Sequence, residues 1–243
     1  MPRGETVGGP PLTIERGVAS GSGGSITGGA NENIMASVAP ELLIVRRAAF
    51  AIEDPWRAPA GCDPIAMRRA TDGTSPRLAT TLVLFADDDC LSVLFNAQDD
   101  AIVATHLRHD APLYEEDVVE IFLAPRDPHR YFEIEVNPLG TTFDAQIDSP
   151  DGTRATMRVD SSWECAGLFA AVRKSPGRLD TIVRVPFASV GSPRPKEGEE
   201  WRANFFRIDR SAEHGDEYSA WQPTMRKLAD FHVPAAFGRI VFA

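Results

Sequence analysis

Two neighbouring segments of this chain alternate between apolar and charged side chains, a pattern typical of β-strands. In residues 112–122, Glu120 falls on the same side of such a strand as Val118 and Phe122. An apolar flank around one glutamate predicts a partly buried carboxylate. Burying that charge costs several kcal/mol unless it is paired or bound to something, so we expect function close to Glu120. The second segment, residues 131–140, would place Phe132, Ile134 and Val136 on one face of its strand. Tyr131, Glu133, Glu135 and Asn137 would lie on the other face.

After residue 40 the chain consists of short β-rich runs separated by turn residues. This pattern predicts an all-β fold, an antiparallel β-sandwich of the jelly-roll or immunoglobulin-like kind. Helix content should be very low, with short turns at 187–190 and 226–230. We expect ten strands, over residues 42–48, 79–86, 91–98, 117–124, 131–137, 142–148, 167–174, 179–186, 201–209 and 238–242.

The charge of the chain restricts its partners. The 243 residues carry a net charge of −10, and nearly all of the excess acid lies after residue 40. An acidic surface repels a phosphate backbone, so we expect no nucleic-acid partner and a ligand that is neutral or cationic. No apolar run approaches the length of a membrane span, so we expect no membrane partner.

The three cysteines are widely spaced, at Cys62, Cys90 and Cys165, and form no CxxC or Cys/His cluster. We therefore expect no structural zinc, and the odd number indicates reduced thiols. Reduced thiols and the lack of a signal-peptide pattern favour a cytoplasmic location.

Residues 1–40 contain nine of the nineteen glycines, which predicts disordered coil ahead of a folded domain over 41–243. Met35 opens a more ordinary sequence, and we expect translation to begin near it. Mass spectrometry of the native N-terminus checks this. A peptide covering residues 21–33 would contradict it.

The folded part carries an ordered series of segments: Asp54-Pro55-Trp56, LVLFADDDCLSVLFNAQD, PLYEEDVVEIFL, YFEIEVNPLGTTFDA, WRANFFRIDR, AWQPT and FHVPAAFGRIVF. The set, over about residues 41–243, resembles the carbohydrate-binding module family 9-like domain, a β-sandwich related to DOMON-type domains. The resemblance implies a non-catalytic protein of bacterial type that binds a terminal or short saccharide and is linked to carbohydrate catabolism. Such modules are usually appended to secreted enzymes, whereas we expect this one to be a standalone domain.

The resemblance also implies which residues bind. In the sugar-binding members two aromatic rings enclose a terminal sugar, and charged and amide groups bond its hydroxyls. By this resemblance the rings fall on Tyr114 and Phe231, the carboxylate on Glu120 and the amide on Asn137. The sugar-binding members have tryptophan at both ring positions and arginine where Glu135 stands. Ionised glutamate only accepts hydrogen bonds, so either the ligand differs or the site is degenerate.

Each candidate has a structural alternative. Tyr114 could be a lid over the edge of the core, and His232 could either contact a ligand oxygen or cap a turn. The polar residues could instead form a buried network with arginines; this alternative joins Glu120, Glu135 and Asn137 to Arg184, Arg202 or Arg207.

Other conspicuous residues fit structural roles. The aspartates 87–89 suit a hairpin turn better than a calcium site, which needs oxygens from several positions. We therefore expect no metal. The tryptophans should pack rather than bind ligand: Trp56, Trp163, Trp201 and Trp221.

Two other functions stay open. Glu120 and Glu135 could be the acid and nucleophile of a glycosidase, if they flank a cleft at the required separation. Haem binding, known in DOMON-type relatives, would need one of three methionines to face a histidine across the sandwich. No strand carries such a pair, so we expect no haem; the methionines are Met67, Met157 and Met225.

Overall fold

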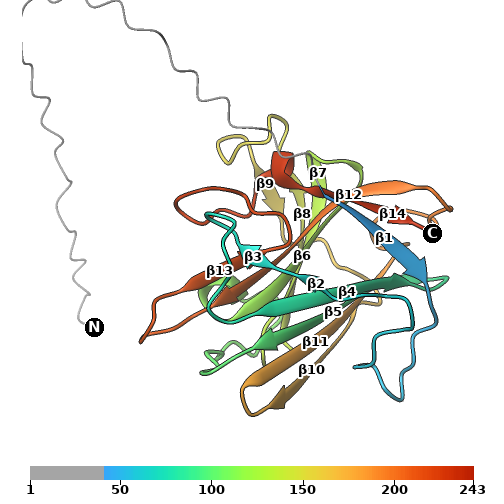
Figure 1. Cartoon of the computed structure of the whole chain (residues 1–243). Helices are drawn as coiled ribbons and strands as arrows, with labels where there is room; N and C mark the ends of the chain where they lie inside the picture. Colours follow the sequence, from blue (N-terminus) through green and yellow to red (C-terminus); the bar gives the residue numbers. More distant parts are fainter. Residues whose placement is uncertain (1–40) are drawn as a thin grey trace, which may run out of the picture. The chain divides into compact units, whose positions relative to one another are not determined.

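The computed structural model describes residues 41–243 (Figure 1). The expected disorder of residues 1–40 and the expected start near Met35 lie outside the described residues. Within the described part, nearly all regular structure is β-strand. The strands and two short 3-10 turns are β1 (Leu42–Arg47), β2 (Ile65–Ala66), β3 (Arg68–Arg69), β4 (Thr80–Ala86), β5 (Cys90–Gln98), η1 (Leu113–Glu115), β6 (Val118–Asp127), β7 (Arg130–Val136), β8 (Thr142–Asp148), β9 (Arg158–Asp160), β10 (Phe169–Ser175), β11 (Arg178–Pro186), β12 (Glu200–Asp209), β13 (Glu217–Ala220), η2 (Pro234–Ala236) and β14 (Gly238–Phe242).

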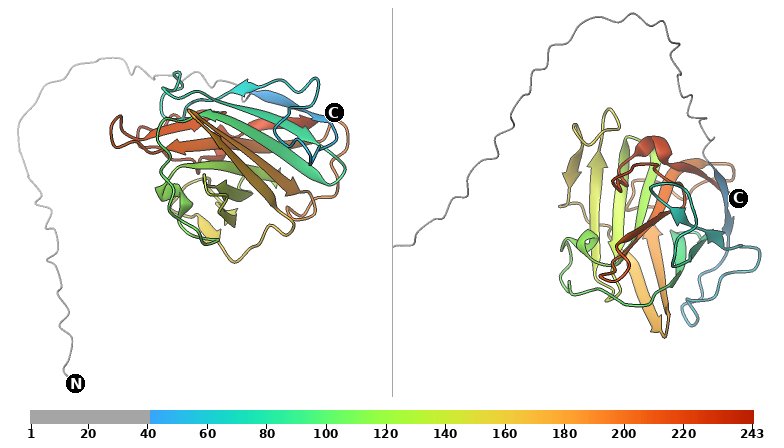
Figure 2. Two further views of the ribbon diagram at one scale, coloured as in Figure 1. Left: turned by 90° about the horizontal axis from the view of Figure 1, so that it is seen from below. Right: turned by 60° about the vertical axis from the view of Figure 1, so that its left-hand side comes forward.

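The strands form two layers that share β1, which confirms the predicted β-sandwich. One layer has the order β1-β14-β12-β6-β7-β8-β9, and β13 and β3 extend it from β12. The other has the order β10-β11-β5-β4, with β2 on β4. Leu42–Val45 of β1 pair with β14, and Arg46 and Arg47 pair with β4. The C-terminus therefore ends beside β1 (Figures 1 and 2).

All ten predicted strands are present, with boundaries that shift by a few residues. One strand departs from the antiparallel pairing expected of the sandwich: β1 runs parallel to both of its neighbours. The four strands that the sequence did not predict, β2, β3, β9 and β13, have two to four residues each. The 3-10 turns lie at Leu113–Glu115 and Pro234–Ala236. Residues 187–191 are a non-helical turn, and 226–230 contain no helical turn.

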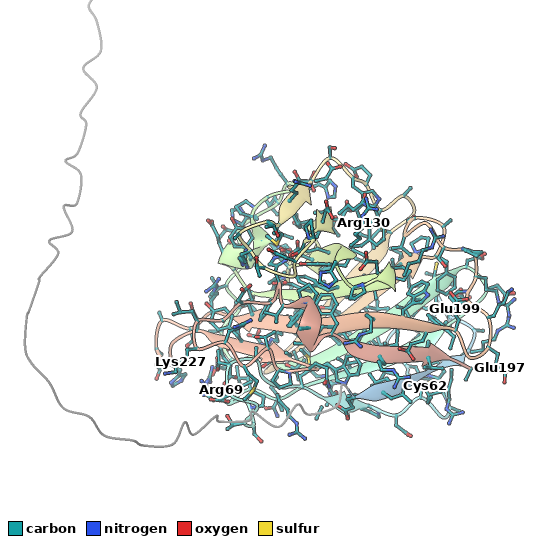
Figure 3. All side chains as sticks on the ribbon, turned by 90° about the horizontal axis from the view of Figure 1, so that it is seen from above. Cys62, Arg69, Arg130, Glu197, Glu199 and Lys227 are labelled. Carbon is teal, nitrogen blue, oxygen red and sulfur yellow. The ribbon has the colours of Figure 1, made fainter. Side chains whose placement is uncertain are left out.

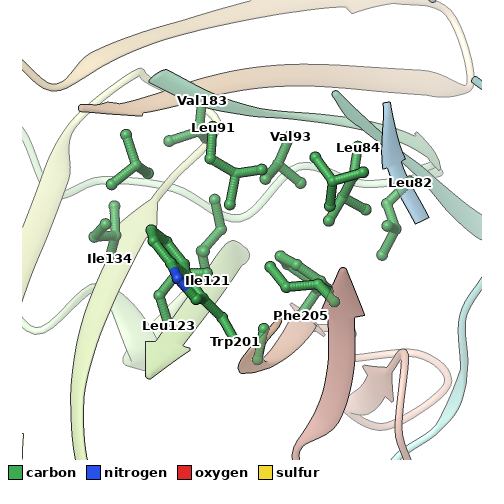
Figure 4. Close-up of a cluster of buried hydrophobic side chains, with 14 of the residues drawn as sticks. Leu82, Leu84, Leu91, Val93, Ile121, Leu123, Ile134, Val183, Trp201 and Phe205 are labelled. Atoms are coloured by element: carbon green, nitrogen blue, oxygen red, sulfur yellow. The ribbon is translucent and has the colours of Figure 1, made fainter. Parts of the chain in front are cut away.

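The main core fills the space between the layers. Leu82, Leu91 and Val183 from one layer face Ile121 and Trp201 from the other (Figure 4). All five are at most 1% exposed. The period-2 alternation makes this possible, because each strand turns every second side chain toward the opposite layer.

The tryptophans pack as predicted. Trp201 and Trp221 are each 1% exposed in the main core. Trp163 packs on Phe132 at 4.7 Å between ring centroids, and the Arg173 guanidinium lies 4.8 Å from the ring of Trp56.

The aspartates at 87–89 form the β4–β5 hairpin turn, as predicted. Oδ1 of Asp87 accepts hydrogen bonds from the backbone N–H groups of Asp89 (3.0 Å) and Cys90 (2.9 Å). Arg184 pairs with Asp87, and Arg194 pairs with Asp88 at 2.9 Å.

The three cysteines are buried, free thiols. Charged side chains such as Arg130, Glu197 and Lys227 lie at the periphery of the domain (Figure 3). Among residues 41–243, no helix is long and apolar enough to cross a membrane.

Candidate functional site

The outer face of β6 and β7 carries the polar residues singled out by their alternation. Val119, Ile121 and Leu123 of β6 enter the main core, so Glu120 points to the opposite face. The antiparallel register sets Glu120 directly opposite Glu135. Side chains at such paired positions are close neighbours on one face of a sheet.

A second apolar cluster covers this outer face and encloses the carboxylates. Phe231 stacks on Phe206 of β12, with 4.1 Å between ring centroids and 10° between ring planes. Phe122 of β6 contacts Tyr131, Phe206 and Phe237 through their rings. The chain around η2 thus packs on the sheet and forms one wall of a hollow.

That hollow is a pocket of about 530 Å³, large enough for a small organic ligand. Its floor is carboxylate, and its walls combine aromatic and aliphatic side chains with two arginines. The lining residues are Tyr114, Glu120, Glu133, Glu135, Phe143, Arg154, Met157, Val159, Ile208, Arg210, Tyr218, Ala229, Phe231 and His232.

Five of the six predicted ligand-binding residues line this pocket: Tyr114, Glu120, Glu135, Phe231 and His232. Asn137 does not. Its side-chain nitrogen donates to the His106 carbonyl at 2.9 Å, and its oxygen accepts from the backbone of Leu139 and Thr141, both at 3.0 Å. The fully buried Asn137 amide therefore holds the β7–β8 turn.

The two predicted aromatic residues have different environments. Tyr114 lies in η1 and is 53% exposed, so its ring is free to meet a ligand. Phe231 is only 7% exposed, because one ring face lies on Phe206 and Tyr218 meets it edge-on at 6.1 Å. Its role combines packing with a limited contribution to the pocket wall.

The floor contains three glutamates rather than two. Glu120, Glu133 and Glu135 are each at most 6% exposed, and one carboxylate oxygen from each lies within 4.8 Å of the others. Oε2 of Glu135 is buried without a hydrogen-bond partner. In the described part of the chain, no lysine or arginine forms an ion pair with these glutamates. Nε2 of the His232 imidazole lies 3.6 Å from Oε1 of Glu133.

Burial dominates the proton affinity of these groups. It raises the pKa of Glu120 and Glu135 well above the ordinary range, and repulsion from neighbouring glutamates adds to the effect. Burial raises the pKa of Glu133 to about 7, although Arg154 partly offsets it. Burial also lowers the pKa of His232 to about 4, so this imidazole is neutral at pH 7 and does not neutralise the cluster.

The two pocket arginines have partners of their own. Nε of Arg154 lies 2.9 Å from Asp230, and Nη1 of Arg210 lies 2.6 Å from Asp216 and 2.8 Å from the Tyr218 hydroxyl. Arg210 also donates to the Tyr114 carbonyl. This last bond ties η1 to the end of β12 and fixes where Tyr114 stands.

The chain matches the model of carbohydrate-binding family 9 over residues 82–242, which is about two thirds of its length. The chain belongs to this family. The match includes β6, β7 and the segment around η2, so it contains the elements that build the floor and one wall of the pocket.

Two solved structures share the family 9 fold with this chain. Both are carbohydrate-binding modules of family 9 from Caldicellulosiruptor kristjanssonii. One is in complex with cellotriose and has a TM-score of 0.58 and 15% identity, with 83% of this chain and 93% of that chain covered. The other is in complex with glucose and has a TM-score of 0.59 and 14% identity, with 84% and 96% covered.

The name of one similar curated protein mentions no ligand. A protein of Arthroderma benhamiae (strain ATCC MYA-4681 / CBS 112371) named "Extracellular protein" is 28% identical over 203 residues, which cover 77% of this chain and 87% of the relative.

The alternative of a buried network between the polar residues and three arginines is wrong, because each of these arginines has other partners. Arg184 pairs with Asp87, and Arg202 donates to the Phe237 carbonyl. Arg207 points between the layers and pairs with Asp99 and Asp209.

One of the methionines considered for haem binding lies near a histidine, but the arrangement does not suit haem. Met157 and His232 both line the pocket, yet the Tyr131 hydroxyl stands between them. It hydrogen-bonds with Nδ1 of His232 at 2.8 Å and lies 4.0 Å from Sδ of Met157. The other ring nitrogen of His232, Nε2, lies 3.6 Å from Oε1 of Glu133, and this adjacent carboxylate floor suits a polar ligand better than a porphyrin.

Two groups in the described residues have donor sets that a metal ion could use. One is the glutamate floor, and the other is His109, Asp144 and Glu164 on the far side of β8. The second group is mostly exposed, and its His109 already bonds Glu164 at 3.2 Å and the Thr142 carbonyl at 2.9 Å.

Several pocket residues were not predicted from the sequence to bind the saccharide: Glu133, Phe143, Arg154, Met157, Val159, Ile208, Arg210, Tyr218 and Ala229. Glu133 was detectable, because the alternation of β7 places it on the same strand face as Glu135. Arg154 and Met157 lie in the connection between β8 and β9, and no local pattern signals where that connection passes.

The glutamate floor predicts a distinctive pH dependence of stability. Glu133 binds its proton more tightly in the folded state, where its pKa is about 7, than at its ordinary value of 4.5. The folded state therefore holds more protons in this window, and stability falls as pH rises from about 4.5 to 7. We expect urea unfolding to show a smaller pH-dependent loss in Glu133→Gln than in the unmodified protein. Equal losses would mean that Glu133 ionises normally when folded.

Proposed function

We propose that this protein binds a terminal or short saccharide in the pocket over β6 and β7 and does so without catalysis. The observation that carries the proposal is the combination in one pocket of a buried carboxylate floor and an exposed aromatic ring, Tyr114. Carboxylate oxygens accept hydrogen bonds from sugar hydroxyls, and an aromatic face packs against the C–H groups of a sugar ring. Membership of family 9 and the sugar complexes of structurally similar modules support it.

The arrangement of the glutamates favours binding over glycoside hydrolysis. In a retaining glycosidase two carboxyl groups flank the scissile bond at about 5–5.5 Å. Glu120 and Glu135 instead stand side by side at paired positions of adjacent strands and project from one floor. A sugar above them would meet both from the same side.

Two further proposals accompany this one. We propose a role in carbohydrate catabolism, which growth of a deletion strain on single sugars would check. We propose a cytoplasmic location, for which three buried free thiols are the support. Cell fractionation checks it, and the name of the Arthroderma benhamiae relative points the other way.

A calorimetric screen of mono- and oligosaccharides tests the binding proposal. We expect dissociation constants between micromolar and millimolar. Tyr114→Ala should weaken the tightest ligand roughly tenfold, because it removes the exposed stacking surface. Its stability should change little, since the ring is half exposed.

Leu107→Ala is the matched control, because Leu107 is 78% exposed and lies outside the pocket. It should bind like the unmodified protein. Binding that survives Tyr114→Ala unchanged, or the absence of any saccharide ligand, would contradict the proposal.

A further inference from the structure

The floor of the pocket lacks a positive charge. Three carboxylates, from Glu120, Glu133 and Glu135, gather within 4.8 Å at 94% burial or more. Clusters of this kind are unfavourable unless protons or a cation neutralise them. Oε2 of Glu135 is buried and unpartnered, although its residue lines the pocket, so it can accept a bond from a ligand.

The pocket's own cations do not fill this role. Arg154 is held by Asp230, and Arg210 by Asp216. Each pair is close to neutral, so the two arginines only partly offset the effect of burial, and the pKa values of the three glutamates stay raised. His232 is neutral at pH 7 because burial lowers its pKa to about 4.

The dimensions favour an ammonium group carried by an organic molecule. An ammonium has three N–H donors, and donor–acceptor distances of about 2.8 Å in tetrahedral directions set its acceptors roughly 4.5 Å apart. One oxygen from each of the three glutamates lies within 4.8 Å of the others, which is compatible with this spacing. A pocket of about 530 Å³ is far larger than a bare metal ion, so the charged group would be one end of a larger ligand.

The walls suit such a ligand as well. Rings of Tyr114, Phe143, Tyr218 and Phe231 surround the space above the floor. Aromatic faces attract cations and also pack on the C–H groups of a sugar. An ionised glutamate at position 135 attracts an ammonium group.

We propose that the saccharide of this pocket is an amino sugar whose ammonium group lies among the carboxylates of Glu120, Glu133 and Glu135. This inference rests on the proposed function and narrows it from saccharides in general to those with a free amine. Binding of an ammonium would favour the ionised carboxylates and release protons, because burial raises the pKa of these glutamates.

Calorimetry with three matched probes tests the inference: glucosamine, glucose and N-acetylglucosamine, which differ at one substituent. At pH 7 we expect glucosamine to bind at least tenfold more tightly than the other two. Its binding heat should vary with the ionisation enthalpy of the buffer, which reports proton release, and the heat of glucose should not. Glu135→Gln should remove most of the glucosamine advantage, whereas Glu213→Gln, a control with an 84% exposed carboxylate, should retain it.

The outcomes separate the two proposals. If glucose or N-acetylglucosamine binds as tightly as glucosamine, the inference is overturned and the proposed function stands. If no saccharide binds, the proposed function fails and the inference fails with it. A titration with calcium chloride alone covers the metal alternative. Calcium binding that Glu135→Gln abolishes would assign the floor to a metal and overturn the inference.

Discussion

Replacing Gly238 with alanine is expected to lower the free energy of unfolding by about 3 kcal/mol, because the new methyl group has no room. A Cβ at this position would lie 2.2 Å from Cη2 of Trp221. Trp221 is 1% exposed in the main core and cannot move without displacing its neighbours. Gly238 opens β14 directly after Phe237, so the change should also loosen the segment that carries Phe231 over the pocket.

Urea unfolding followed by far-ultraviolet circular dichroism measures the effect. Gly140→Ala is the control, since nothing lies within 4 Å of its Cβ position and only its positive φ of 80° makes alanine unfavourable, by about 1 kcal/mol. Adding Trp221→Leu should restore part of the loss in Gly238→Ala, because the smaller side chain frees space. Equal losses of stability in Gly238→Ala and Gly140→Ala would contradict the steric explanation.

Replacing Arg207 with methionine is expected to cost about 3–5 kcal/mol of stability, the range for breaking a buried ion pair. Its guanidinium is 3% exposed and donates to Asp99 at 3.0 Å, to Asp209 at 2.7 Å and to the Thr80 hydroxyl at 3.1 Å. Methionine would leave Asp99 and Asp209 close together and buried. Since Thr80 and Asp99 belong to the layer opposite β12, the network also joins the two layers.

Arg158→Met provides the comparison for this prediction. Arg158 pairs with Asp148 at 3.2 Å, but its side chain is 77% exposed, so its loss should cost less than about 1 kcal/mol. Combining Arg207→Met with Asp99→Asn should recover part of the stability, because one unpaired charge disappears. An Arg207→Met variant as stable as Arg158→Met would show that the network contributes little.

The strands and the burial of Glu120 between apolar neighbours were predictable because both follow from a local period. Alternation of two residues depends only on the strand itself. The parallel pairing of β1 was not predictable in the same way, because it depends on where the chain returns after two hundred residues. The very short strands β2, β3, β9 and β13 contain too few residues for a period to appear.

Asn137 was predicted to bind the ligand but does not line the pocket, and the physical reason is similar. Alternation extrapolated from β7 sets it on the face of Glu135, but the strand ends at Val136. The backbone N–H of Asn137 then bonds the Thr141 carbonyl at 3.0 Å, which closes a tight turn and directs the side chain to the turn itself. Arg154 and Arg210 reach the pocket from segments outside the regular strands, whose course the tertiary packing decides.

A crystal structure with the tightest saccharide from the calorimetric screen tests the central claim most directly. The account predicts a sugar beside Tyr114, with its polar groups within hydrogen-bonding distance of Glu120 and Glu135. A sugar bound elsewhere would contradict it, for example in the hollow lined by Phe187, Arg194 and Phe242, with the pocket over β6 and β7 empty.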